Sequence, residues 1–307
     1  MAAAQLAIAY DGSPSAVTAV RVAGALLAGA KATIVTVPEP PPQPVRGASR
    51  FLMNVPSGTL ERALEEIAAQ AVQEARTIAA EGVGHAAGLD AEPLVTKPHT
   101  PAWEALLDAA RGADALVCGA RGRSELARTV LGSTSTSLLH HAELPLLVIP
   151  DDCEPADGPV LIAYDGSPAA DRAIDLAGRL LAGRAAVVVH VYESQYRDSR
   201  AVRALAHGEV KEIVQALDEA LTDEAGATTE QGVVRARAAG LDATGETIEA
   251  SQGVWRTISA LARDRDAGLV VTGSRGQGGA RSVLLGSVSS GLVHHAEAPV
   301  LVGHADQ

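Results

Sequence analysis

The sequence predicts an α/β protein of two tandem domains, each an open, twisted parallel sheet of five strands with helices on both faces. One observation is an internal repeat: Ala-Tyr-Asp-Gly-Ser-Pro at residues 9–14 returns at 163–168, and His-His-Ala-Glu at 140–143 returns at 294–297. The other is that short apolar runs alternate with amphipathic stretches in each half, the pattern of successive β-α-β units. A repeat this long indicates duplicated domains rather than a solenoid.

The two copies divide the 307-residue chain into three parts. We expect a first domain at residues 1–150, a linker at 151–158 and a second domain at 159–307. The linker is acidic and carries Pro155, a composition typical of an exposed connection.

The first half opens with a short buried strand, Leu6–Tyr10, followed by a helix with Ser13 as its N-cap and Pro14 at its first position. The proline-rich stretch after the second strand, residues 38–56, is predicted to be a surface loop and a candidate lid. The later elements are expected, in order, as strand Ala32–Val37, helix Ser57–Glu81 with an apolar face of Leu60, Leu64, Ile67, Ala71, Ala75 and Ile78, strand Ala91–Thr96, a helix from Thr100-Pro101, strand Ala113–Cys118, helix Ser135–Ala142 and strand Leu144–Ile149.

The second half repeats this order without the proline cluster. Its elements are expected as strand Val160–Tyr164, helix Pro168–Leu181, strand Ala185–Tyr192, a helical stretch Arg200–Ala225, strand Thr247–Ala250, helix Val254–Arg263, strand Gly268–Thr272, a last helix and strand Pro299–Val302.

A glycine-spaced loop follows the fourth strand of each half. Gly119, Gly122 and Gly132 precede Ser133 and a helix, and the same spacing returns at Gly273, Gly276, Gly286 and Ser287. Glycines let backbone N–H groups approach a ligand, and the start of a helix favours an anion, so a phosphate is the expected ligand. In an open parallel sheet the crevice lies at the carboxyl ends of the strands, where Asp11 and Asp165 also end their strands. Arg121 and Arg275, inside the loops, are candidates to add positive charge.

The composition excludes several classes of partner. A formal net charge of −12 argues against nucleic acid and anionic membranes as partners. Two cysteines without paired spacing indicate neither a disulfide framework nor a zinc site, which favours a reducing compartment. The apolar run near the N-terminus is too short for a signal peptide or a membrane span, so we expect a cytoplasmic protein.

These residues resemble the universal stress protein family in its tandem form, over essentially the whole chain. The family signature is an aspartate after the first strand and Gly-x2-Gly-x9-Gly-(Ser/Thr), and both halves keep every element. The resemblance implies a Rossmann-like sheet of the adenine-nucleotide α-hydrolase type. It also implies that ATP, with or without Mg²⁺, binds at both sites, because the glycine signature marks the members that bind ATP.

The resemblance also implies a role for each site residue. Asp11 and Val37 would meet the adenine end and Gly119 the ribose, while Gly122, Gly132, Ser133 and Thr134 would hold the phosphates. The matching residues of the second half are Asp165, Val191, Gly273, Gly276, Gly286, Ser287 and Val288. The two valines rest on the resemblance alone.

Plainer interpretations stand beside these. The glycines fit a tight turn before a helix, and Asp-Gly-Ser-Pro fits a turn and N-cap. The histidine pairs near helix ends fit partners of the helix dipole better than metal ligands. Cys118 fits a small core residue better than a redox sensor. Trp103 and Trp255 fit the core.

The chain lacks the lysine of a P-loop, since Lys31, Lys97 and Lys211 are its three lysines and none is near the glycine loops. We therefore expect ATP capture by a stress-response regulator or binding module rather than fast turnover. A slow ATPase or nucleotidyl-transfer enzyme is the alternative, and a purely structural protein is a third. AMP or a cyclic nucleotide stays open as the ligand, because the loop chemistry is directed at phosphate.

The fifth strand of each half is apolar and expected at a sheet edge. An unpaired apolar edge favours association. We therefore predict an intramolecular pseudo-dimer through the two fifth strands, and association of whole chains as a homodimer stays open.

Overall fold

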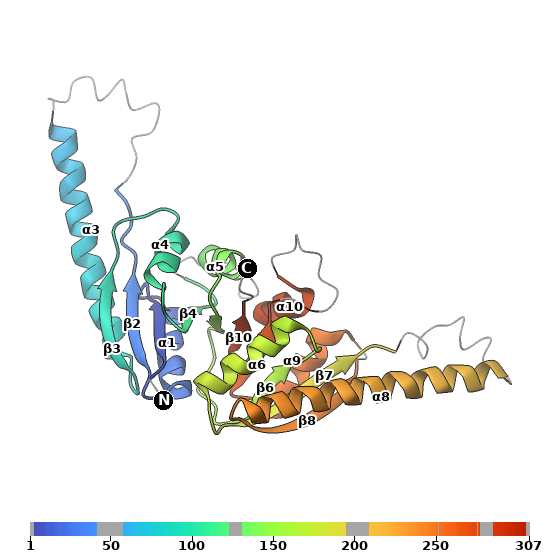
Figure 1. The fold of residues 1–307 in the computed structure, drawn as a ribbon. Helices are drawn as coiled ribbons and strands as arrows, with labels where there is room; N and C mark the ends of the chain where they lie inside the picture. Colours follow the sequence, from blue (N-terminus) through green and yellow to red (C-terminus); the bar gives the residue numbers. More distant parts are fainter. Residues whose placement is uncertain are drawn as a thin grey trace.

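The computed structural model describes residues 3–41, 58–122, 131–194, 209–250, 252–274, 276 and 285–304. Helices and strands alternate along this part of the chain (Figure 1). The first half contains β1 (Gln5–Ala9), α1 (Pro14–Leu26), β2 (Lys31–Thr36), α3 (Thr59–Gly84), β3 (Asp90–Val95), α4 (Ala102–Ala109), β4 (Ala115–Gly119), α5 (Ser133–His141) and β5 (Leu146–Ile149). The second half contains β6 (Val160–Ala163), α6 (Pro168–Leu180), β7 (Ala185–Tyr192), α8 (Glu209–Ala238), β8 (Asp242–Glu249), α9 (Val254–Asp264), β9 (Leu269–Gly273), α10 (Ser287–His295) and β10 (Val300–Gly303).

The described strands form one ten-stranded sheet in the order β3-β2-β1-β4-β5-β10-β9-β6-β7-β8. Within each half the neighbouring strands are parallel. The predicted α/β class, with a mostly parallel sheet covered by helices on both faces, is confirmed. The two expected five-stranded sheets are joined, however, because β5 and β10 pair antiparallel, with Leu147 opposite Leu301.

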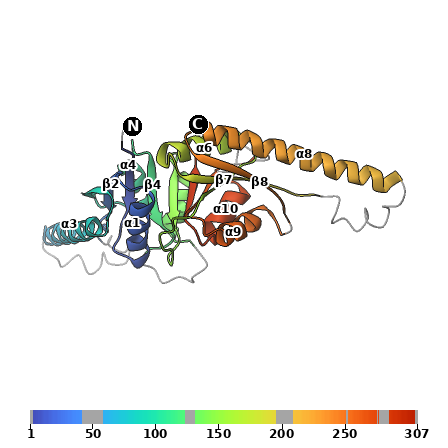
Figure 2. The same ribbon diagram turned by 90° about the horizontal axis from the view of Figure 1, so that it is seen from below.

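Two apolar layers lie on opposite faces of this sheet. Residues of each strand alternate between them: Leu6 and Ile8 of β1 face one layer and Ala7 faces the other, as the period of two requires. Helices α1, α3, α6 and α8 pack on the first face and α4, α5, α9 and α10 on the second. Figure 2 shows the same elements from below. The carboxyl ends of β1 and β4 therefore meet between two helical layers.

The expected caps of the first helix in each half are confirmed. The Ser13 hydroxyl accepts a hydrogen bond from the Ala16 N–H at 3.2 Å, and the Ser167 hydroxyl accepts one from the Ala170 N–H at 3.2 Å. Pro14 and Pro168 occupy the first helical turn. Both helices are thereby fixed directly after the aspartate that ends the preceding strand.

Two predicted elements of the second half are longer than expected. Helix α8 continues to Ala238 instead of ending at Ala225, although Gly226 and Thr229 are poor helix formers. Burial explains the extension, because Thr229, Val233 and Ala236 are buried on the sheet. Strand β8 begins at Asp242 rather than Thr247, because its polar residues pair with β7 along the whole edge.

The apolar face predicted on α3 is buried only toward the end of the helix. Ala75 is buried, whereas Ile67 is 43% exposed. The helix extends beyond the neighbouring strands, and α8 does the same at the opposite end of the sheet (Figure 1). The side chain of Leu60 and residues 42–57, which include most of the candidate lid, lie outside the described part of the chain.

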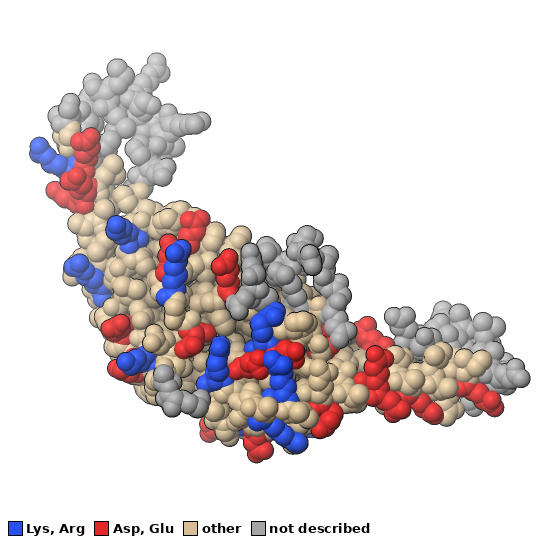
Figure 3. All heavy atoms as spheres, viewed as in Figure 1, with Lys and Arg blue, Asp and Glu red and all other residues tan. Residues whose placement is uncertain are grey.

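Acidic side chains gather along the projecting part of α8 on the face in Figure 3. The exposed acidic residues of this part of α8 include Glu219, Asp223 and Glu224. On the central body the same view shows acidic and basic side chains interspersed. Among the described residues, no helix is both long enough and apolar enough to cross a membrane.

Candidate functional site

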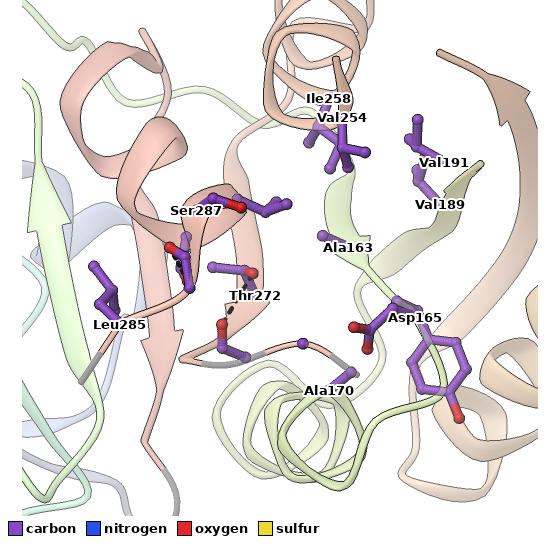
Figure 4. A pocket seen from close by; sticks show the side chains of 16 residues that line it. Ala163, Asp165, Ala170, Val189, Val191, Val254, Ile258, Thr272, Leu285 and Ser287 are labelled. Atoms are coloured by element: carbon purple, nitrogen blue, oxygen red, sulfur yellow. Dashed lines mark hydrogen bonds between the residues drawn. The ribbon is translucent and has the colours of Figure 1, made fainter. Parts of the chain in front are cut away.

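Each half has a cavity at the carboxyl ends of its strands, and the predicted site residues line it. The first cavity, of about 200 Å³, is lined among others by Asp11, Val37, Gly119, Arg121, Gly122, Gly132, Ser133 and Thr134. The second cavity, of about 530 Å³, is lined among others by Asp165, Val191, Gly273, Gly276, Gly286, Ser287 and Val288 (Figure 4). Arg275 lies outside the described residues. The chain therefore brings fifteen of the sixteen predicted residues to two equivalent places.

The two aspartates combine a turn with a position at the cavity. Asp11 Oδ1 accepts a hydrogen bond from the Ser13 N–H at 3.0 Å, and Asp165 Oδ1 accepts one from the Ser167 N–H at 3.0 Å. The other oxygen faces the glycine loop, because a Cβ on Gly122 would lie 3.0 Å from Asp11 Oδ2. Figure 4 shows the Asp165 carboxylate turned toward the second cavity. The turn interpretation thus accounts for one carboxylate oxygen, and the other faces the glycine loop at the cavity.

The first glycine of each loop is required by packing, whatever the ligand. A Cβ on Gly119 would lie 2.8 Å from the Ser15 carbonyl oxygen, and one on Gly273 would lie 2.7 Å from the Ala169 carbonyl carbon. These distances are too short for any side chain, so the glycines let β4 and β9 end directly against α1 and α6. The strand ends and the helix starts are held together as one wall of the cavity.

The two ends of each loop are joined by a backbone hydrogen bond. The Gly132 N–H donates to the Ala120 carbonyl at 2.9 Å, and the Gly286 N–H donates to the Ser274 carbonyl at 2.7 Å. Gly132 and Gly286 are the N-caps of α5 and α10, and neither helix has a side-chain cap. The first N–H groups of both helices are therefore presented beside the cavity, where the helix dipole favours an anion.

Sequence reasoning missed the hydroxyls that support the loop. The Ser135 hydroxyl donates to the Gly119 carbonyl at 2.8 Å, and the Ser289 hydroxyl donates to the Ser274 carbonyl at 3.2 Å. In the first half the Ser15 hydroxyl also accepts the Arg121 N–H at 3.2 Å. The available signal for the first pair was a serine three residues after the third glycine in both halves, Ser135 and Ser289. No spacing rule links Ser15 to the loop.

The Arg121 guanidinium does not lie free at the first cavity. It forms an ion pair with Asp151, which follows β5, and the two side chains are only 19% and 16% exposed. Asp151 lines a further cavity between the two halves together with Arg121, Asp152, His294 and Glu297. The arginine expected to strengthen the loop thus has its charge directed toward the boundary between the halves.

Cys118 is a buried residue whose thiol stays protonated. Burial raises its pKa to about 12, and a hydrogen bond with Ser135 acts in the opposite direction. A thiol with such a high pKa is a poor nucleophile, which agrees with the interpretation as a small core residue. Cys118 and Cys153 are both free.

The paired histidines take part in ring stacking. His141 stacks on Trp103 with 4.5 Å between ring centroids, and His295 stacks on Trp255 at 4.7 Å. Both tryptophans are partly buried and pack against the apolar core on this face of the sheet. Within the described residues, no group of three or more His, Cys, Asp or Glu side chains is arranged to hold a metal ion.

Comparisons with known proteins agree with the division into two similar halves. The model of the universal stress protein family matches residues 5–150 and 158–304. A universal stress protein of Mycolicibacterium smegmatis is 34% identical over 248 residues, which cover 78% of this chain and 77% of that protein. One from Mycobacterium tuberculosis H37Rv is 31% identical over 246 residues, with coverage of 78% and 77%. The crystal structure of a universal stress protein from Archaeoglobus fulgidus shares the fold, with a TM-score of 0.56, 20% identity and coverage of 98% of both chains.

Proposed function

The chain belongs to the universal stress protein family, and from that premise we propose that each half binds one adenine nucleotide, with ATP as the ligand. The proposed sites are the first and second cavities. The observation that carries the proposal is that the described residues of the signature line one cavity in each half. We further propose that the protein acts as a nucleotide-responsive regulator or binding module in the stress response.

The phosphate end of the proposed ligand lies at the glycine loop. Gly122, Gly132, Ser133 and the Thr134 backbone surround the start of α5, which has no side-chain cap. Helix N-termini with exposed N–H groups favour phosphate groups through both hydrogen bonds and the dipole. The same holds for Gly276, Gly286, Ser287 and Val288 at α10. We propose that any Mg²⁺ binds together with the phosphates, since the described residues include no group of three His, Cys, Asp or Glu side chains arranged to hold it.

The base end of the proposed ligand lies at the apolar side of each cavity. Val35, Val37 and Leu106 line the first cavity on this side, and Val189, Val191 and Ile258 line the second. A flat, largely apolar ring with a few polar edges suits such walls. Asp11 and Asp165 supply a carboxylate oxygen that accepts hydrogen bonds from an amine or a hydroxyl.

We also propose that the halves act as an intramolecular pseudo-dimer, with domains at residues 1–150 and 159–307 and a linker at 151–158. Support comes from the antiparallel pairing of β5 with β10, in which Leu146, Leu147 and Val148 face Val302, Leu301 and Val300. The unpaired thiols Cys118 and Cys153 favour the cytoplasm as the compartment.

The first test is the nucleotide content of the freshly purified protein. Denaturing the protein and chromatographing the supernatant should release ATP at about two molecules per chain. ADP in its place would favour the alternative of a slow ATPase, which incubation with Mg²⁺ and ATP would then measure as turnover. A protein that carries no nucleotide and also gives no heat with added ATP in calorimetry would contradict the proposal.

A double variant tests the location of the sites. Gly132→Val with Gly286→Val should abolish ATP binding and leave the fold intact, because the added side chains stand where backbone meets phosphate. At Gly132 a Cβ would also press on the loop, 3.3 Å from the Arg121 Cα. The matched control is Gly84→Val with Gly226→Val, at helical glycines with open space around the missing Cβ. Normal ATP binding by the first variant would refute the site assignment.

A further inference from the structure

Arg121 links two cavities of the molecule. It lines the first cavity, and it also lines the cavity between the halves, of about 570 Å³, together with Asp151, Asp152 and the end of α10. Its backbone is fixed at the first cavity, since its N–H donates to the Ser15 hydroxyl at 3.2 Å. Its guanidinium forms the ion pair with Asp151, which is not among the residues that line the first cavity. A single residue therefore has its backbone at the proposed phosphate site and its charge on a carboxylate outside it.

The ion pair is mostly shielded from solvent. The exposed fractions of the Arg121 and Asp151 side chains are 19% and 16%, so screening by water is weaker than for a surface pair. The pair is also incompletely satisfied, because Asp151 Oδ1 is buried and has no hydrogen-bond partner among the residues that the structure describes. A guanidinium can form two parallel hydrogen bonds to a carboxylate or to a phosphate, so the two anions are direct competitors for it.

The repeat offers an internal comparison. Arg275 stands at the position of Arg121, but Ala305 stands at the position of Asp151, and Ala169 stands at that of Ser15. In the sequence, therefore, only the first half has a carboxylate at the position of Asp151. One additional positive charge beside the phosphate site attracts a triphosphate more strongly than a monophosphate, because the triphosphate carries more negative charge.

We propose that Asp151 sets the affinity and phosphate selectivity of the first site by competing with the bound phosphates for the Arg121 guanidinium. This inference rests on the proposed nucleotide binding. While the pair is closed, the first site holds its ligand through the glycine loop and the helix start, and the number of phosphates matters little. When the pair opens, the guanidinium turns to the phosphates and the site favours ATP over AMP.

The test is calorimetry with ATP and with AMP on the full chain, with the second site blocked by Gly286→Val. Adding Asp151→Ala should tighten ATP binding roughly tenfold, the size of one charge-assisted contact, and change AMP binding by less than about threefold. Asp152→Ala is the matched control, because it removes the same charge from the neighbouring residue, which lines the same cavity but is exposed. Asp151→Asn keeps the side-chain volume and replaces Asp151→Ala if that variant unfolds.

A second arm assigns the effect to Arg121. Adding Arg121→Gln to Asp151→Ala should reverse the gain, because the guanidinium that the loss of Asp151 frees is then absent. The inference is overturned if Asp151→Ala leaves ATP affinity unchanged, if AMP gains as much as ATP, or if the gain survives the loss of Arg121. If neither the unmodified protein nor any of the variants binds nucleotide, the proposed function is refuted instead.

Discussion

At the scale of single residues, the glycines of the two loops have different physical reasons to be glycine. Gly119 and Gly273 leave no room for a Cβ between strand and helix. Gly122 and Gly276 face an aspartate oxygen, at 3.0 and 2.7 Å from a built Cβ. Gly132 closes the loop by a hydrogen bond to Ala120. One spacing pattern therefore combines a packing demand, a contact with the carboxylate and a helix start.

Gly119→Ala should consequently lower stability even without a ligand. The new methyl group would meet the Ser15 backbone, and overpacking of this kind costs about 1–3 kcal/mol. Gly226→Ala should instead raise stability by about 0.5–1 kcal/mol, because that glycine lies in α8 with open space around it. Urea unfolding of ligand-free protein measures both changes. Equal stability of the Gly119→Ala variant and the unmodified chain would show that β4 does not press on α1.

At the scale of helices and strands, the amphipathic periods and the caps were sufficient to predict most elements. Pro14 and Pro168 begin helices as expected, and strand Ala185–Tyr192 has the predicted bounds. The elements that were predicted incorrectly share one cause: tertiary packing, rather than local sequence, determined where they end and which residues they bury. Helix α8 runs through Gly226 and Thr229, which local propensity disfavours, since Val233 and Ala236 gain burial on the sheet. The apolar face of α3 has the right period, but the helix extends past the neighbouring strands, and Ile67 is 43% exposed.

The site was predictable to the extent that it depends on short spacings. The glycines and aspartates occur in one repeated order, and the fold brings them to the same cavities. The partner of Arg121 was not predictable, because Asp151 follows a different strand and pairs through the arrangement of β4 beside β5. Ser15, which holds the same loop from α1, was missed for the same reason.

The caps give a prediction at this scale. Ser13→Ala and Ser167→Ala each remove a hydrogen bond of 3.2 Å to the first turn of α1 or α6. Each should cost about 1 kcal/mol, the usual value of an N-cap. Thermal unfolding of the two variants measures the cost, and an unchanged melting temperature would contradict the capping role.

At the scale of the whole molecule, the sheet is continuous because each half supplies the edge that the other needs. Leu147 and Leu301 face each other at the centre of the antiparallel pair, and both are buried. A chain ending at residue 150 would expose β5, an apolar edge of Leu146–Ile149. That half-chain should dimerise or aggregate in gel filtration, whereas Leu147→Lys in the same half-chain should shift it toward the monomer. A monomeric half-chain without the lysine would contradict the pseudo-dimer.

His294, near the end of α10, gives a prediction about pH. Burial lowers the pKa of His294 below its ordinary value of 6.5, and His295 and His140 lower it further. Arg121, Asp151, Asp152 and Glu297 line the same cavity between the halves. Since His294 takes up its proton at a lower pH when folded than when unfolded, the unfolded chain binds more protons as the pH falls through 6.5.

Acidification should therefore destabilise the folded chain through this residue. The free energy of unfolding of the unmodified protein should fall more between about pH 7.5 and 5.5 than that of His294→Gln, which has no proton to gain at this position. Comparing the two slopes removes the contribution of the carboxylates, which both proteins share. Identical slopes would mean that His294 titrates in the folded chain as it does in the unfolded chain.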